Sequence, residues 1–214
     1  MNSSSVNRRQ FVKSTALVSA AAFIPVSVKG ANDTINVALI GCRNKGFGIL
    51  KDSLGYDDAR CTAMCDVDRN VLEERAAEVQ KTFGQKPKLY KDYRKMLEQK
   101  DIDAVIIGTP DHWHCLQLVD SVQAGKDVYV EKPMANTIEE CNIMVKAANY
   151  YDRVVQVGQQ QRSNQIFVEV MKLIKSGAIG SLRKVNMWAN FNYGLGADPA
   201  MDEPVPDGVD YDLW

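Results

Sequence analysis

The sequence has few of the residues that mark specialised protein classes. Its 214 residues include only two histidines and five cysteines, and the cysteines form no C-x-x-C pair. This spacing does not suit a zinc module, and an odd, scattered set favours buried small side chains over a disulfide framework. The cysteines are Cys42, Cys61, Cys65, Cys115 and Cys141. With 45% hydrophobic and 25% charged residues, the chain has the composition of one or two globular domains.

The chain also lacks an excess of positive charge. Lys and Arg total 26 against 27 Asp and Glu, and four of the basic residues precede Ala31, where there is no acid. From Asn32 onward the count is 22 against 27. A balance of this sign argues against nucleic acid as a partner.

Residues 1–31 have the pattern of an export signal. Arg8 and Arg9 stand before a short apolar stretch rich in Ala and Ser, at residues 14–25, which is too short for a membrane helix. This order resembles a bacterial twin-arginine signal. We therefore expect recognition by the twin-arginine export machinery, a periplasmic or otherwise exported location, and no stable membrane span after processing. An uncleaved anchor or a frayed terminus is the alternative.

Short apolar segments alternate with helical patterns through the middle of the chain. The apolar segments predict strands buried on both faces, at residues 34–40, 61–65, 104–107, 128–130 and 154–157. The predicted helix faces consist of Leu72, Ala76, Val79 and Phe83, of Cys115, Leu118, Val119 and Val122, and of Ile138, Cys141, Val145 and Ala148. This alternation predicts an α/β fold with a doubly wound parallel sheet of the Rossmann type.

The pattern changes after Gly158. A helix is predicted over residues 165–175 and a strand over residues 182–192. We therefore divide the chain into a signal segment (1–31), a dinucleotide-binding Rossmann domain (32–158) and the incomplete beginning of an α+β C-terminal domain (159–214).

A glycine-bearing turn follows the first predicted strand and opens a helix, where a dinucleotide fingerprint belongs. Gly41 suits the tight turn, and Gly46 permits close packing of helix on strand. Arg43 occupies the position at which an absent side chain would let the backbone approach pyrophosphate. Arg43, Asn44 and Lys45 are candidates to donate hydrogen bonds to phosphate instead. The alternative interpretation is a common glycine-bearing turn before a helix, with no role in binding.

Asp66 lies 20 residues beyond Gly46, at the end of the second predicted strand. A carboxylate there accepts hydrogen bonds from the adenosine ribose and repels a ribose phosphate, so we expect NAD in preference to NADP. Nearby Arg69 opposes that preference, and a cap on the helix that starts near Asp68 is the alternative role.

Two further predicted strand ends carry polar side chains. Residues 109–114, Thr-Pro-Asp-His-Trp-His, include both histidines, and Glu131-Lys132-Pro133 follows the strand at 128–130. A lysine beside bound NAD can shift its pKa downward and exchange a proton with a substrate hydroxyl. The alternative is a surface lysine paired with Glu131.

The two histidines have no obvious third ligand, so we predict no metal site. We expect Asp111 to cap a helix and one histidine to pack against the cofactor.

In combination, these residues resemble the Gfo/Idh/MocA oxidoreductase family, which includes glucose-fructose oxidoreductase and inositol dehydrogenase. The resemblance covers residues 35–214 and rests on the glycine turn, Asp66, Thr109-Pro110 with His114, and Glu131-Lys132-Pro133. It implies that Lys132 is the catalytic group, contacting substrate and nicotinamide ribose, and that Thr109, Pro110, His114 and Glu131 line the cofactor site. Trp113 and Arg162 are candidate substrate contacts.

The resemblance implies an NAD-dependent oxidoreductase acting on a sugar or polyol-like substrate, and a homo-oligomer at full length. Some relatives with similar signals instead cleave glycosides without net redox change. A third hypothesis is a non-catalytic protein that binds the nucleotide. The family's downstream acid/base residues, usually an Asp and a His, have no match before Trp214. We therefore expect a fragment that holds cofactor but lacks the groups that complete catalysis.

Overall fold

The structure, a computed structural model, describes residues 34–188 and 202–214. The predicted signal segment lies outside the described residues. Contacts divide the chain into Met1–Thr34 and Ile35–Trp214, and the second unit contains the sheet and its helices. No helix in the described ranges is long and apolar enough to cross a membrane.

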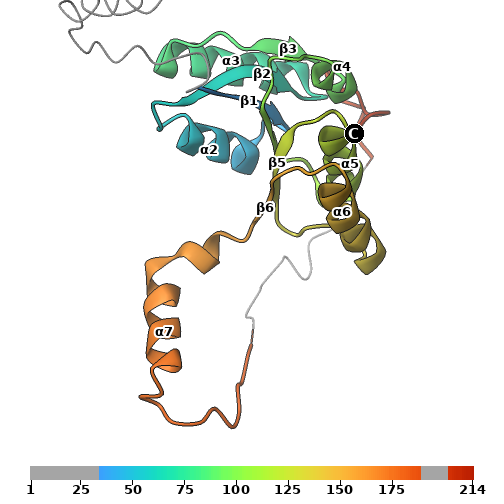
Figure 1. The fold of residues 1–214 in the computed structure, drawn as a ribbon. Coiled ribbons are helices and arrows are strands. Elements are labelled where there is room, and N and C mark those ends of the chain that lie inside the picture. The colour runs from blue at the N-terminus through green and yellow to red at the C-terminus, as the bar shows by residue number, and fades with distance from the viewer. Residues whose placement is uncertain (1–33, 189–201) are drawn as a thin grey trace, which may run out of the picture. The chain divides into compact units, whose positions relative to one another are not determined.

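Within the described ranges, six parallel strands form one sheet in the order β3-β2-β1-β4-β5-β6 (Figure 1). They are β1 (Ile35–Ile40), β2 (Ala59–Cys65), β3 (Lys88–Tyr90), β4 (Ala104–Ile107), β5 (Asp127–Glu131) and β6 (Val155–Gly158). The chain order reverses between neighbouring β1 and β4, and this reversal opens a crevice at their carboxyl ends. The predicted α/β Rossmann fold is confirmed.

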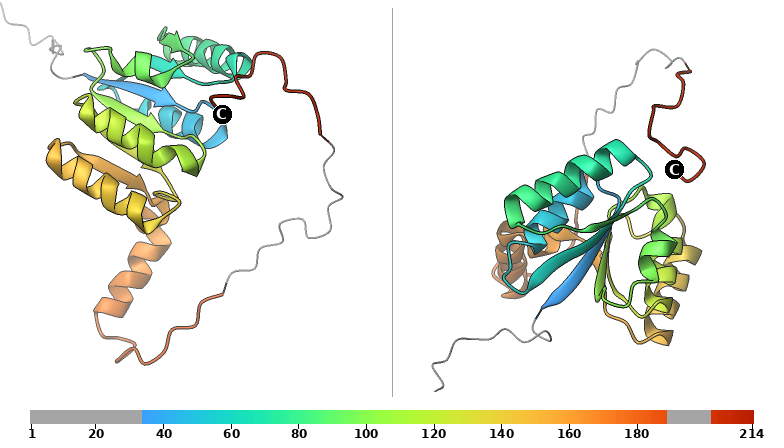
Figure 2. Two further views of the ribbon diagram at one scale, coloured as in Figure 1. Left: turned by 90° about the vertical axis from the view of Figure 1, so that its right-hand side faces the viewer. Right: turned by 90° about the horizontal axis from the view of Figure 1, so that it is seen from above.

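Helices cover both faces of the sheet, as the right-hand view of Figure 2 shows. One face carries α2 (Asn44–Ser53) and α3 (Arg69–Phe83); the other carries α4 (Tyr93–Leu97), α5 (His114–Gln123) and α6 (Ile138–Tyr150). Two buried clusters result, because alternate residues of a strand point to opposite faces.

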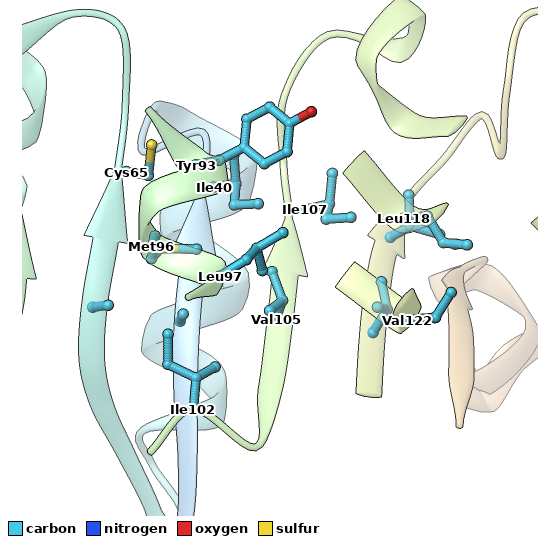
Figure 3. Packing of buried hydrophobic residues seen from close by; sticks show 14 of the residues in the cluster. Ile40, Cys65, Tyr93, Met96, Leu97, Ile102, Val105, Ile107, Leu118 and Val122 are labelled. Carbon is cyan, nitrogen blue, oxygen red and sulfur yellow. The ribbon is translucent and has the colours of Figure 1, made fainter. Parts of the chain in front are cut away.

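Alternate residues of β1 belong to the two clusters. Val37 and Leu39 pack with α2 and α3, whereas Ala38 and Ile40 pack with the opposite layer. Figure 3 shows the second cluster, in which Ile40 lies near Met96 of α4. Strands buried on both faces explain why the sequence segments were continuously apolar rather than alternating.

Helix α6 buries only part of the predicted face: Cys141 and Ala148 are half-buried, but the other two residues are exposed. Ile138 is 77% exposed and Val145 is 53% exposed, whereas Met144 is 1% exposed. Apolar side chains occur around most of this helix, so periodicity alone does not single out the packed side. Packing against α5 and the strand layer selects the face that carries Met144.

The strand predicted over 182–192 is absent from its described part. Residues 182–188 have no regular structure, and Val185 and Trp188 are exposed. A strand requires backbone partners, and the described sheet offers none to this segment. The preceding helix α7 (Gln165–Lys175) forms as predicted, with Asn164 accepting a hydrogen bond from the Ile166 N–H at 3.0 Å. Most of its apolar side chains are exposed, whereas Val168 and Ile174 are half-buried.

Candidate nucleotide-binding site

A cavity of about 560 Å³ lies at the carboxyl ends of β1, β2 and β4. This volume is within the range of small-molecule sites. Its lining includes eight of the predicted residues: Gly41, Arg43, Asn44, Lys45, Asp66, Thr109, Pro110 and Trp113. Five others are not part of this lining: Gly46, His114, Glu131, Lys132 and Arg162.

The turn after β1 has no room for side chains at its two key glycines. Gly41 has φ +86°, and a Cβ there would come within 2.7 Å of the Gly108 and Thr109 backbone. A Cβ on Gly46 would overlap the carbonyl oxygen of Gly41. The backbones of β1, α2 and the end of β4 therefore meet closely beneath the cavity, as the glycine spacing predicted.

Helix α2 presents its N-terminus to this turn. Its N-cap residue is Arg43, which makes no side-chain cap, and the first turn contains no acid. The first main-chain N–H groups of a helix lack intrahelical acceptors and carry partial positive charge, so they suit an anion such as a phosphate. The Arg43 side chain itself forms an ion pair with Asp68, the N-cap residue of α3 in the loop after β2.

Asp66 is oriented by the backbone around it. Its Oδ2 accepts a hydrogen bond from the Cys42 N–H at 2.6 Å, and its Oδ1 accepts one from the Asp68 N–H at 2.9 Å. Each carboxylate oxygen has a second lone-pair direction, which leaves capacity for ribose hydroxyls. The alternative capping role belongs to Asp68, which accepts from the Asn70 and Val71 N–H groups.

The loop after β3 and the first residues of α4 supply lining residues that were not predicted: Lys91, Asp92, Tyr93 and Arg94. Arg94 binds both carboxylate oxygens of Asp92 at 2.8 Å, and this contact holds the pKa of Asp92 below its usual value. The Tyr93 hydroxyl donates to Asp120 at 2.7 Å. β3 has only three residues and no apolar run, so it gave no signal that a strand end would lie here.

His114 lies behind the cavity rather than in its wall. Its ring is buried, with Nδ1 2.7 Å from the Pro133 carbonyl oxygen and Nε2 2.9 Å from the Thr109 carbonyl oxygen. The ring thus connects the loop after β4 to the loop after β5. Because His114 does not line the cavity, its position gives no support to the prediction that one histidine packs against the cofactor.

The predicted helix cap by Asp111 is wrong. Asp111 lies inside a single 3₁₀ turn (Asp111–Trp113) whose N-cap position is Pro110, and neither this turn nor α5 has a side-chain cap. The turn starts directly after Pro110, one residue earlier than a cap at Asp111 would require. The neighbouring Thr109 hydroxyl instead donates to the Gln117 side-chain oxygen at 2.7 Å.

Glu131 is a buried carboxylate that contacts three polar groups. It accepts a hydrogen bond from the Lys132 main-chain N–H at 2.8 Å and one from the Gln160 side-chain amide, and it lies 3.9 Å from the Lys45 ammonium. Gln160 was not among the predicted site residues; it follows β6, whose end lies beside that of β5. Glu131 therefore links the glycine turn to the ends of β5 and β6.

Lys132 is exposed, and within the described residues its ammonium makes no ion pair. The predicted alternative, a pair with Glu131, is not formed, because Glu131 binds the Lys132 main chain instead. Arg162 lies apart from the cavity, in a second hollow that also includes Phe167 and Met171 of α7.

The cysteines are free thiols, and Cys42, Cys61 and Cys65 are buried. Burial raises the pKa of Cys61 to about 12. These side chains act as small apolar groups beneath the site, as their spacing predicted.

Several curated proteins match the chain over 154 residues. A glycosyl hydrolase family 109 protein of Shewanella pealeana is 30% identical, and an alpha-N-acetylgalactosaminidase of Shewanella oneidensis is 27% identical. Each match covers 70% of this chain and 34% of the relative. The chain therefore spans about a third of the length of the curated relatives it matches.

Solved dehydrogenases share the fold. The WlbA dehydrogenase from Bordetella pertussis, in complex with NADH and UDP-GlcNAcA, is 28% identical with a TM-score of 0.63, over 69% of this chain and 43% of that one. The scyllo-inositol dehydrogenase from Lactobacillus casei, with bound NAD(H) and scyllo-inositol, is 25% identical with a TM-score of 0.62, over 69% and 42%.

A family model described as "Oxidoreductase family, NAD-binding Rossmann fold" matches residues 35–159, which include the glycine turn, Asp66, His114 and Lys132. The fold, the cavity at the strand reversal and this match lead to one conclusion: the chain belongs to the Gfo/Idh/MocA oxidoreductase family.

Proposed function

We propose that the chain binds NAD in this cavity and serves hydride transfer to or from a sugar or polyol-like substrate, with Lys132 as the proton-handling group. The observation that carries the proposal is the cavity at the reversal of strand order, bounded by the glycine turn and Asp66. These residues fit a dinucleotide, because the turn admits close backbone approach, α2 starts without an acid, and Asp66 faces the ribose position. Bound NAD supplies the hydride carrier.

The charges around the cavity favour NAD over NADP. All four basic side chains of the lining have an acidic partner: Arg43 with Asp68, Lys45 with Glu131, Lys91 with Asp210, and Arg94 with Asp92. A ribose 2′-phosphate would meet the Asp66 carboxylate among cations that are already neutralised. The cost of bringing two anions together at short distance disfavours NADP.

The chain's part in the chemistry is to hold Lys132 at the nicotinamide end of the site. Glu131 fixes the Lys132 backbone, and His114 binds the carbonyl of Pro133 immediately after it. The exposed ammonium is free to donate a proton to a substrate oxygen, or to accept one once deprotonated. Positioning of this kind is what a general acid or base requires.

Two substitutions test the proposal by separating nucleotide binding from turnover. Asp66→Asn should weaken NADH binding about tenfold, since a hydrogen bond to a charged group contributes about 1.5–3 kcal/mol, and should narrow the preference for NADH over NADPH. Lys132→Ala, made in the complete gene product, should leave NADH affinity within about twofold and reduce turnover at least a hundredfold, in line with the general size of acid–base catalysis.

Lys146→Ala, at an exposed lysine on α6, is the matched control for Lys132→Ala and should change neither quantity. Fluorescence titration of NADH and steady-state rates supply the measurements. Turnover that survives in Lys132→Ala would remove Lys132 from its assigned role.

A redox-neutral glycoside hydrolase is the second candidate function. The names of the matched relatives, a glycosyl hydrolase family 109 protein and an alpha-N-acetylgalactosaminidase, favour it. The bound ligands of the solved dehydrogenases, UDP-GlcNAcA and scyllo-inositol, favour a sugar-like substrate for either function. Carbohydrates and aryl glycosides should be assayed for NADH formation and for glycosidic cleavage in the same samples: net NADH identifies a dehydrogenase, and cleavage without net NADH identifies the hydrolase.

The proposal includes export by the twin-arginine route, supported by Arg8 and Arg9 ahead of the short apolar stretch. Replacing both with Lys should retain the protein in the cytoplasm, which cell fractionation would detect. Equal export of the variant and the original protein would contradict this assignment.

A further inference from the structure

A segment that is distant in sequence from the nucleotide motifs lies against the cavity. Residues 208–214 bind the loop that joins β2 to α3: the Gly208 carbonyl accepts a hydrogen bond from the Arg69 N–H at 3.0 Å, and the Asp210 N–H donates to the Val67 carbonyl at 2.9 Å. Val209 and Asp68 form an antiparallel bridge between these contacts. The segment therefore pairs through one isolated bridge with the loop that carries Asp66.

The same segment is anchored on the opposite side of the cavity. The Trp214 main-chain oxygen accepts a hydrogen bond from the Trp113 indole N–H at 2.9 Å and lies 3.1 Å from His112 Nε2. The Tyr211 ring stacks on the Trp214 ring, with 5.6 Å between centroids. In Figure 1 this end of the chain, marked C, lies beside α4 and α5.

An ion pair fastens the middle of the segment to the loop after β3. The Lys91 ammonium lies 2.5 Å from Asp210 Oδ2, and the Asp210 side chain is 18% exposed. Hydrogen bonding to Lys91 lowers the pKa of Asp210, so the carboxylate is charged at neutral pH. Val209, Leu213 and Trp214 all contribute to the cavity lining, as do Asp66 and Tyr93.

We infer that residues 208–214 form an outer wall of the adenosine half of the site and slow the release of a bound adenine nucleotide. This inference rests on the proposed binding of NAD in the cavity. Apolar side chains from the segment face the cavity together with Tyr93 and Trp113, and a flat apolar base such as adenine suits such a lining. The nucleotide leaves when the contacts at the two sides of the wall open.

Stopped-flow release of NADH, chased with excess NAD, tests this role. Asp210→Ala removes the ion pair with Lys91, and Trp113→Phe removes the donor to Trp214 while it keeps an aromatic ring. We expect each variant to release NADH about threefold faster and the double variant about tenfold faster. Asp212→Ala, the same change at an exposed acid two residues from Asp210 and outside the cavity lining, is the matched control and should release NADH at the original rate.

Competition by half-molecules locates the effect. Asp210→Ala should weaken the binding of ADP, which carries the adenosine half alone, by about threefold. The affinity for nicotinamide mononucleotide should stay unchanged. If Asp210→Ala and the double variant both bind NADH and release it at the original rate, residues 208–214 do not slow nucleotide release and the inference is wrong. If the original chain binds no NADH, the proposed function itself fails, and the two failures are therefore distinguishable.

Discussion

The proposed adenosine half and the proposed nicotinamide half of the site are built in different ways. Around the adenosine position, backbone meets backbone: Gly46 lies on Gly41, and Asp66 is held by main-chain N–H groups. Around Lys132, side chains hold the loops, through the buried ring of His114 and the buried carboxylate of Glu131.

This difference has a functional consequence. The proposed nucleotide binding depends on close packing that the fold itself requires, whereas the position of Lys132, the proposed proton-handling group, depends on a few hydrogen bonds from polar side chains. We therefore expect substitutions in the first half to affect folding and binding together, and substitutions in the second half to affect mainly the placement of Lys132.

The largest expected effect comes from a methyl group at the packed glycine. Gly46→Ala places a Cβ against the carbonyl of Gly41, and the overlap should lower the free energy of unfolding by about 3 kcal/mol and abolish NADH binding. Gly48→Ala, on the same helix, is the control: its Cβ meets nothing within 4 Å, and it should raise stability by up to about 1 kcal/mol. Urea denaturation measures both. Equal stability of the two variants would show that the glycine contact is not limiting.

A smaller effect is expected from removing the tether between the two halves. His114→Ala removes the ring that bridges the carbonyl oxygens of Thr109 and Pro133, and it leaves these oxygens without this partner. The free energy of unfolding should fall by about 2 kcal/mol. NADH should still bind, while turnover should fall because Lys132 is no longer held. Leu116→Ala, at an exposed position on the same helix, should change neither. If NADH affinity falls more than turnover, the division into two halves is wrong.

The smallest effect is expected at the rim of the adenosine half. Arg94 lowers the pKa of Asp92 in the folded state, so this carboxylate stabilises the fold above its unfolded pKa of about 4, and the contribution is lost as the pH falls through the lowered pKa. Asp92→Asn should cost about 0.5 kcal/mol at pH 7, the usual size for a partly exposed ion pair.

The pH series supplies the check on this rim contact. The difference between Asp92→Asn and the original chain should shrink as the pH falls below about 4, as followed by thermal denaturation across pH. The Asn side chain still accepts the Arg94 N–H as a helix cap, so the comparison isolates the charge. A difference that persists unchanged at pH 3 would assign the effect to something other than the ion pair.

Much of the site was predictable because its residues follow apolar strands. Asp66, Thr109 and Glu131 each come directly after or near the end of such a segment, and parallel strands bring their carboxyl ends to one edge. Lys91 and Gln160 were not predicted, because no local sequence pattern marks either residue as part of the site. The strand before Lys91 is too short to form an apolar pattern, and Gln160 acquires its role only by reaching Glu131 from the neighbouring strand end.

The sequence by itself determined the parallel sheet, the glycine turn and the carboxylate at the end of the second strand, because these depend on local apolar runs and on side-chain size. The tertiary structure decided which face α6 buries, that His114 joins two loops from behind the cavity, and that Trp113 meets Trp214 across 101 positions of the chain. The physical reason is that burial and long-range hydrogen bonds depend on which surfaces pack together, and a local pattern states that a residue is apolar or polar without stating what it will face.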